Sequence, residues 1–269
     1  MEQLSFTNAK KLKSVEIRNH IRKETYTSHT AGLATDKLQT NIVIIPKEFS
    51  EDFTKFCESN PKACPLVGKT DIGDPFFNNL GNDIDIRYDV PSYNIYENGY
   101  LKKSVQNIEK YWNKNLVGFA IGCSFTFEHE LLKNNFSIDH INNNKIVPMY
   151  KTNIRNLVSG VFASNMVVSM RIFKKSDKKK IVDISKKFLF AHGAPIYIGN
   201  PNNIGIKNIL KPNWGNVPRE KNENENYYFW ACGVTPQNAV MHAKLPFCIS
   251  HTPGHMLITD KLEKDLLSL

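Results

Sequence analysis

Four polar turns hold the residues whose chemical types could support catalysis. Each turn follows a short apolar run, and the four occupy residues 122–128, 192–195, 231–237 and 251–255. Together they supply thiol, carboxyl and imidazole groups, which exchange protons or attack carbonyl carbons. In layered folds of strands and helices, ligands bind beyond the strand ends, where such turns converge. We therefore expect the four turns to line one site.

Cys123 and Glu128 are the candidate nucleophile and general acid of the first turn. The Gly-x-Ser-x-Gly pattern of strand-turn nucleophiles is absent and no base can be assigned beside Cys123, so a small buried core thiol is the favoured alternative. Glu128 follows an apolar run, and burial would raise the pKa of its carboxyl group toward general-acid use. A carboxylate that merely begins a helix is the other interpretation.

Three histidines, His192, His251 and His255, stand in turns that contain glycine and proline. The spacing of His251 and His255 fits a metal pair only on a helix, and Pro253-Gly254 disfavours a regular helix there. We expect these imidazoles to transfer protons, with hydrogen bonding to the turn backbone as the alternative.

Carboxylate-binding groups are predicted in the later segments. Thr235 and Pro236 have the form of a helix start, whose free N–H groups could receive an anion, and Gly233 would let a ligand or another backbone approach closely. An ordinary capped helix is the alternative. Arg171 follows the apolar run 167–170 and could hold a carboxylate with its two-pronged guanidinium, although a structural ion pair is the competing interpretation.

Residues 83–90 alternate apolar and charged residues, as a strand with one charged face would. Asp83 and Asp85 would share that face and repel each other, which raises the pKa of one carboxyl group, and Arg87 on the same face would oppose the shift. Arg87 is a second candidate carboxylate clamp. No metal is indicated, but Asp83 and Asp85 would be the ligands if a divalent ion assisted.

Alternating strands and helices must position these segments. Helices are expected over residues 8–24, 50–60 and 104–114 and from about Glu128, a hairpin at Asn98-Gly99, and strands over residues 41–45, 83–90, 116–123, 166–170, 195–198, 228–234 and 247–250. This order predicts α/β layers, and the hairpin and the basic middle segment suggest a second, α+β piece inserted into or packed on the first. The layered main domain would comprise roughly residues 1–115 plus 190–269, and the smaller α+β domain residues 116–189.

The composition is that of an ordinary globular protein, with 41% hydrophobic residues in 269 and a net charge of +9. Five cysteines without a Cys-x-x-Cys pair indicate free thiols, and the longest weakly polar run is too short to span a bilayer. We expect a cytoplasmic protein that binds no membrane. The basic run 171–187 predicts a solvated helix face. Since no nucleic-acid-binding module accompanies it, we expect a small anionic substrate and no nucleic acid.

A collinear series of motifs from about Thr30 to Asp260 resembles the D-glutamate cyclase family, whose bacterial members carry a hydro-lyase name. The segments are Cys64-Pro65-Leu66-Val67-Gly68, Gly73-Asp74-Pro75, residues 83–91, 122–128 and 147–154, Val167-Val168-Ser169-Met170-Arg171, His192-Gly193-Ala194-Pro195, and residues 231–237 and 251–260. The chain departs from the family pattern at residues 155–160, where a Pro-rich turn with a cysteine is expected, and at Ile172, where a proline is usual.

The resemblance implies a fold of two mixed α/β domains and a lyase that removes water from a small acid. In characterised members D-glutamate closes to 5-oxo-D-proline, so the site must take a proton from nitrogen and supply one to oxygen. A histidine of the turns would be the base, Glu128 or an aspartate of the 83/85 pair the acid, and Arg171 or Arg87 the clamp. Backbone N–H groups near Cys123 or Gly233 would stabilise the oxyanion.

This chemistry requires no organic cofactor. A non-catalytic binding protein for a small anionic metabolite would use the same carboxylate sites, and a hydrolase of a cyclic amide would use the same groups in reverse.

Overall fold

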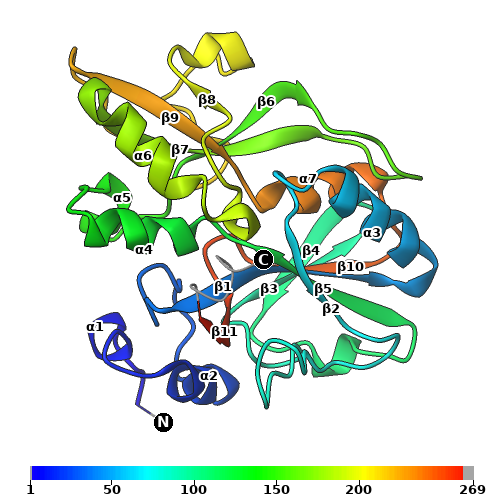
Figure 1. Cartoon of the computed structure of the whole chain (residues 1–269). Coiled ribbons are helices and arrows are strands. Elements are labelled where there is room, and N and C mark those ends of the chain that lie inside the picture. Colours follow the sequence, from blue (N-terminus) through cyan, green and yellow to red (C-terminus); the bar gives the residue numbers. More distant parts are fainter. Residues whose placement is uncertain (1, 263–269) are drawn as a thin grey trace.

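The computed structural model describes residues 2–262, whose strands form two antiparallel sheets (Figure 1). The large sheet has the order β2-β5-β1-β10-β3-β4, and β11 shares one edge of β1 with β10. The small sheet has the order β6-β7-β9-β8. The strands are β1 Lys37–Pro46, β2 Leu66–Lys69, β3 Tyr93–Glu97, β4 Tyr100–Val105, β5 Leu116–Gly122, β6 Met149–Arg155, β7 Asn165–Lys174, β8 Tyr197–Ile198, β9 Glu225–Ala231, β10 Cys248–His251 and β11 Leu257–Leu262.

Helices cover both sheets, so the mixed α/β fold expected from the sequence is confirmed. The α-helices are α1 Phe6–Ala9, α2 Ser14–Arg22, α3 Ser50–Ser59, α4 Phe125–Lys133, α5 Asp139–Asn142, α6 Lys178–Ser185 and α7 Val234–Ala243. Short 3-10 turns are η1 Lys47–Phe49, η2 Glu109–Tyr111, η3 Lys175–Asp177, η4 Leu189–Ala191 and η5 Pro201–Ile204. Within residues 2–262, no helix combines the length and apolar character needed to cross a membrane.

The two sheets do not follow the expected division of the chain. β5 belongs to the large sheet, although residues 116–189 were expected to form the smaller part, and β8 and β9 belong to the small sheet, although they lie after residue 190. The reason is that the chain crosses between the sheets twice, through α4 after β5 and through α7 after β9. Periodicity along the chain can indicate a strand but not the strand with which it pairs.

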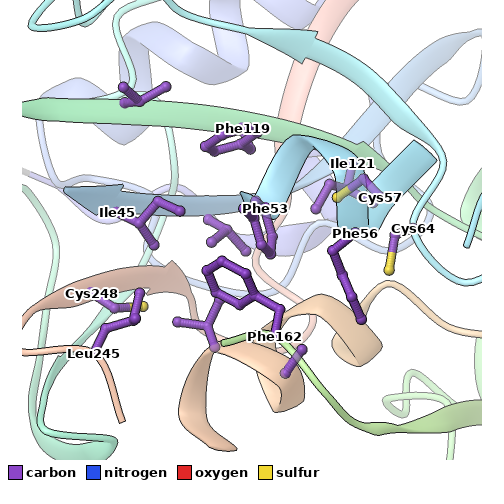
Figure 2. Packing of buried hydrophobic residues seen from close by; sticks show 14 of the residues in the cluster. Ile45, Phe53, Phe56, Cys57, Cys64, Phe119, Ile121, Phe162, Leu245 and Cys248 are labelled. Carbon is purple, nitrogen blue, oxygen red and sulfur yellow. The ribbon is translucent and has the colours of Figure 1, made fainter. Parts of the chain in front are cut away.

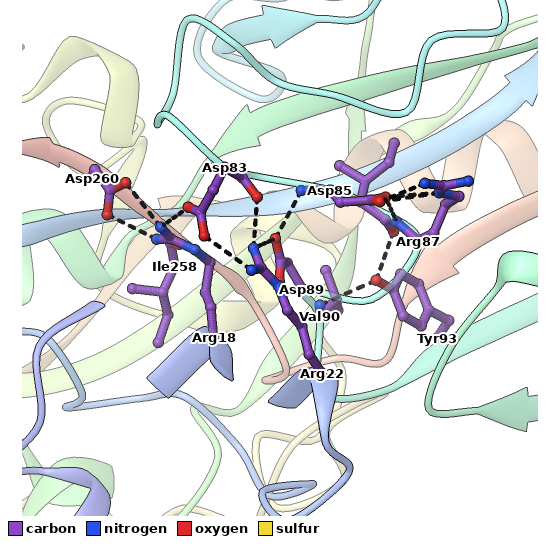
Figure 3. A network of polar contacts seen from close by, with 11 residues as sticks. Arg18, Arg22, Asp83, Asp85, Arg87, Asp89, Val90, Tyr93, Ile258 and Asp260 are labelled. Atoms are coloured by element: carbon purple, nitrogen blue, oxygen red, sulfur yellow. Dashed lines mark hydrogen bonds and ion pairs between the residues drawn. The ribbon is translucent and has the colours of Figure 1, made fainter. Parts of the chain in front are cut away.

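The expected strand at residues 83–90 is wrong. The segment turns back on itself, with the Asp89 N–H donating to the Asp85 carbonyl at 3.0 Å. Ile84, Ile86 and Val90 enter the core on one face of the large sheet. The aspartates between them pair with arginines, as Figure 3 shows. Apolar and charged residues therefore alternate in this segment although it forms no strand.

The expected helix at 104–114 is also wrong, because β4 runs on through Val105 as the partner of β3 and only η2 follows. The hairpin is confirmed: Asn98 and Gly99 have φ of 52° and 81°, as a type I′ turn requires. α4 begins at Phe125, three residues before the expected start. The lysines of α6 are exposed, as the predicted solvated helix face requires, but Arg171 of the same basic run is buried in β7.

The β6–β7 connection ties the two sheets together. α3 and α7 pack on one face of the large sheet, and Phe162 inserts between them from the small sheet's connecting loop (Figure 2). Its ring lies edge-on to that of Phe53, with centroids 5.0 Å apart, and is fully buried. Neighbouring Val161 is 48% exposed. Phe162 therefore anchors the loop in the core of the large sheet.

We predict that Phe162→Ala lowers the free energy of unfolding by about 3–5 kcal/mol, because a buried aromatic ring is replaced by a cavity. Val161→Ala, the control from the same loop, should change it by less than about 0.5 kcal/mol. Urea unfolding of both variants measures the difference. Equal stabilities would show that the loop is not anchored by this ring.

Candidate active site

Two strand–turn–helix units of the same pattern meet where the sheets adjoin. β5 passes through Cys123 and Ser124 into α4, and β9 passes through Cys232 and Gly233 into α7. In both units a threonine lies three residues after the cysteine, and a carboxylic acid or an amide lies two residues after the threonine. The first unit has Cys123, Thr126 and Glu128 at these positions, and the second has Cys232, Thr235 and Gln237. Only these few positions coincide between the two units.

The first unit joins the sheets through a buried ion pair. Glu128 on α4 accepts from Arg171 on β7, with Arg171 Nε 2.8 Å from Oε1 and a second, shorter contact from Nη2. The remaining Arg171 contacts are to Ser169 Oγ at 2.5 Å and Ser124 Oγ at 2.8 Å. The two residues predicted as acid and clamp are thus brought together, and the guanidinium fork is occupied by the protein's own groups.

The pKa of Glu128 moves opposite to the expectation. Burial alone would raise it, but the neighbouring Arg171 guanidinium and His140, whose Nε2 lies 3.1 Å from Glu128 Oε1, outweigh burial and lower the pKa to about 2. Glu128 is therefore ionised at neutral pH and cannot donate a proton. The sequence indicated that Glu128 is buried, but it did not indicate that Arg171, 43 residues later in the chain, lies beside it.

The second unit is the uncharged counterpart of the first. Gln237 on α7 contacts His251 on β10, with Nε2 2.7 Å from Nδ1 and 3.1 Å from the His251 carbonyl oxygen. Thr235 was expected to cap the helix, but the cap is Gly233, and Thr235 Oγ1 accepts instead from the Val167 N–H at 3.0 Å. A Cβ on Gly233 would lie 1.9 Å from Asn41 Nδ2, so a protein side chain makes the expected close approach.

The thiols of both turns are held in the neutral form. Burial raises the pKa of Cys123 far above its usual range and that of Cys232 to about 11. Neither group is a thiolate at neutral pH, which supports the packing interpretation of Cys123. All five cysteines are free and buried.

His192 is the candidate base whose geometry suits proton transfer. It follows η4, which lies against the end of β5 so closely that a Cβ on Gly122 would be 1.6 Å from the Phe190 carbonyl oxygen. The His192 backbone has φ of +74°, a conformation that costs energy in a residue with a side chain. Nδ1 lies 2.8 Å from the Lys62 carbonyl oxygen, which can only accept, so Nδ1 carries the hydrogen.

The other ring nitrogen, Nε2, is buried without a hydrogen-bond partner in the described part of the chain. Burial, with a smaller contribution from Arg171, lowers the pKa of His192 to about 4. Nε2 is therefore an unprotonated acceptor at neutral pH.

A cavity of about 620 Å³ adjoins His192 at the boundary of the two sheets. We call it the junction cavity. Its walls are the end of α3, the residues after β6, and the segment around η4. The cations Lys62, Arg155 and Lys186 line it together with apolar side chains that include Leu157, Met166 and Leu189. A concave, largely apolar pocket with a few polar groups is the usual form of a small-molecule site.

The other residues that were predicted as site residues do not line the junction cavity. Arg87 is paired with Asp85 at 2.7 Å, and Asp83 with Arg18 at 2.6 Å, in the loop on the opposite face of the large sheet from α3 and α7 (Figure 3). His255 lies near His29, and Met256 packs with Cys123. Among residues 2–262, no group of three or more His, Cys, Asp or Glu side chains could hold a metal ion.

Sequence reasoning missed Lys62, Arg155 and Asn156 as cavity residues. Arg155 and Asn156 open the turn at which the chain departs from the resembled pattern, and that departure was the available signal. The sequence held no such signal for Lys62, because the fold of residues 60–64, and not a motif, places it at the cavity.

These features define a mixed α/β protein with a buried polar centre between two sheets. A profile of the family described as D-glutamate cyclase matches residues 117–260. Relatives named "Putative hydro-lyase" are found in Pelagibacter ubique, 47% identical over 95% of this chain and 97% of the relative, and in Dinoroseobacter shibae, 47% identical over 91% and 81%. A third, from Aliivibrio fischeri, is 44% identical over 94% of this chain and 95% of its own.

The chain therefore belongs to the D-glutamate cyclase family. A solved nitrogen repressor-like protein from Methanococcus jannaschii aligns over 94% of this chain and 99% of its own with 11% identity and a TM-score of 0.38, which is too low to bear on the fold.

We predict that the free energy of unfolding falls as the pH drops from about 6.5 to 4. His192 and His251 would gain protons in the unfolded chain near pH 6.5, but burial keeps both neutral in the folded chain until about pH 4. The unfolded state binds more protons in this window, so acidification favours it, by on the order of 3 kcal/mol for each histidine.

Urea unfolding at several pH values measures this slope. His192→Gln should reduce it by close to one proton, whereas Val161→Ala, which removes no titratable group, should leave it unchanged. An unchanged slope in His192→Gln would contradict a buried, neutral imidazole.

Proposed function

We propose that this protein is a hydro-lyase that closes D-glutamate, or a closely related small amino dicarboxylic acid, to 5-oxo-D-proline and water. The observation that carries the proposal is His192, which lines a cavity together with cations and whose buried Nε2 has no partner among the described residues. Family membership and the names of the relatives support the same class of reaction.

The reaction forms a bond between the α-nitrogen and the γ-carboxyl carbon and breaks one bond from that carbon to oxygen. The nitrogen loses two protons and the departing oxygen gains two. His192 Nε2 would accept each proton from nitrogen and return it to oxygen, so one imidazole serves as base and then as acid. This relay replaces Glu128, which is ionised and held by Arg171.

The substrate's carboxylates require cations. Lys62 and Arg155 have no ion-pair partner within residues 2–262, and both line the junction cavity. They would hold the carboxylates and stabilise the charge that develops on oxygen in the transition state. Arg171 would act from outside the cavity, by fixing the turn that carries Ser124. Besides the C–N bond that forms and the C–O bond that breaks, the steps transfer only protons, so they require no organic cofactor.

We predict that the purified protein converts D-glutamate to 5-oxo-D-proline, and that His192→Gln lowers turnover by a factor on the order of 10²–10⁴. Incubation with both enantiomers of glutamate and of 5-oxoproline, followed by chiral chromatography, measures conversion in either direction. His20→Gln is the matched control and should keep wild-type turnover.

Binding of D-glutamate without conversion would instead identify a non-catalytic binding protein. A loss of less than tenfold in His192→Gln would rule out this histidine as the proton relay.

A further inference from the structure

Arg155 and Asn156, at the end of β6, form a wall shared by two cavities. One is the junction cavity, and the other, of about 420 Å³, lies beyond them and is lined also by Lys151 and His242. Any ligand that fills the junction cavity toward β6 must therefore meet these two side chains. They differ in chemistry, since one is a cation and the other a neutral amide.

Asn156 presents an unused hydrogen-bond acceptor. The residue is buried, with a relative exposure of 8%. The backbone N–H donates to the Ser164 carbonyl at 3.1 Å, and Nδ2 donates to Ser164 Oγ at 3.2 Å. These two bonds hold the amide in place, and Oδ1 is left buried with no partner among the described residues. Buried acceptors without a partner are rare and costly, which indicates a missing donor.

Arg155, the preceding residue, lines the same two cavities and presents an unused cation. The side chain is exposed, and no carboxylate of residues 2–262 pairs with it. A guanidinium of this kind binds a carboxylate through two parallel hydrogen bonds. The pair thus offers one acceptor for an N–H donor and one fork for a carboxylate, which matches the two groups on the α-carbon of an amino acid.

We propose that Asn156 and Arg155 select the substrate of the proposed cyclisation. Asn156 Oδ1 accepts an N–H of the substrate amine, and Arg155 binds a carboxylate of the same molecule. The inference rests on the proposed function and narrows its substrate class to dicarboxylic acids that carry an amine. A dicarboxylic acid without a donor leaves Oδ1 unpaired, and sites built to pair with an N–H reject such analogues strongly.

Calorimetric titration with D-glutamate and with glutarate, which lacks the amine, tests the selection independently of turnover. The wild-type protein should bind D-glutamate at least tenfold more tightly than glutarate. Asn156→Leu should bring the two affinities within threefold by weakening D-glutamate alone. Arg155→Met should weaken both ligands by similar factors. Asn153→Leu, on the same strand and outside both cavities, should change neither affinity.

Asn156→Asp keeps the side-chain volume and guards against misfolding of the leucine variant. Its carboxylate should widen the preference for D-glutamate, because it attracts the ammonium group and repels glutarate. The assignment of Asn156 would be overturned if folded Asn156→Leu kept the wild-type ratio of D-glutamate to glutarate affinity, or if Asn156→Asp narrowed that ratio. The proposed function would still stand in that case, provided that the wild-type protein converts D-glutamate. Failure of the wild-type protein to bind either acid would overturn both.

Discussion

The buried ion pair between Glu128 and Arg171 is the constraint on which the centre of this protein depends. Both side chains are almost fully removed from water, and each would be strongly destabilising without the other. Arg171 also lies over the rings of Phe127 and Trp230, at 5.2 and 5.3 Å from their centroids. Because Glu128 follows a strand of the large sheet and Arg171 belongs to the small one, the ion pair links the two sheets.

The position of the candidate base follows from the same junction. β5 is followed by α4, which carries Glu128. The end of β5 also contacts η4, because Gly122 has no side chain and lets Phe190 approach closely. That contact sets the segment from which His192 reaches the Lys62 carbonyl. The second crossing, through α7, uses neutral groups, with Gln237 on His251. The charged pair therefore stands at one crossing and neutral groups at the other.

Local chemistry could be predicted from the sequence, and long-range pairing could not. The hairpin at Asn98-Gly99 and the buried strand β5 depend on neighbouring residues and were predicted correctly. Residues 83–90 alternate as a strand would because two of their aspartates, Asp83 and Asp89, pair with Arg18 and Arg22, some 65 residues earlier. In the site, residue types identified the turns, but the ionisation of Glu128 and the orphaned Oδ1 of Asn156 depend on contacts between distant segments.

The coupling between Glu128 and Arg171 is most directly tested by a double-mutant cycle on the free energy of unfolding, with Glu128→Gln, Arg171→Met and the double variant. If the pair joins the sheets, each single change leaves a buried polar group uncompensated and costs about 3–5 kcal/mol. The double variant should then cost at least about 2 kcal/mol less than the sum of the two. Costs that add to within about 0.5 kcal/mol would show that the two residues act independently and would contradict this account.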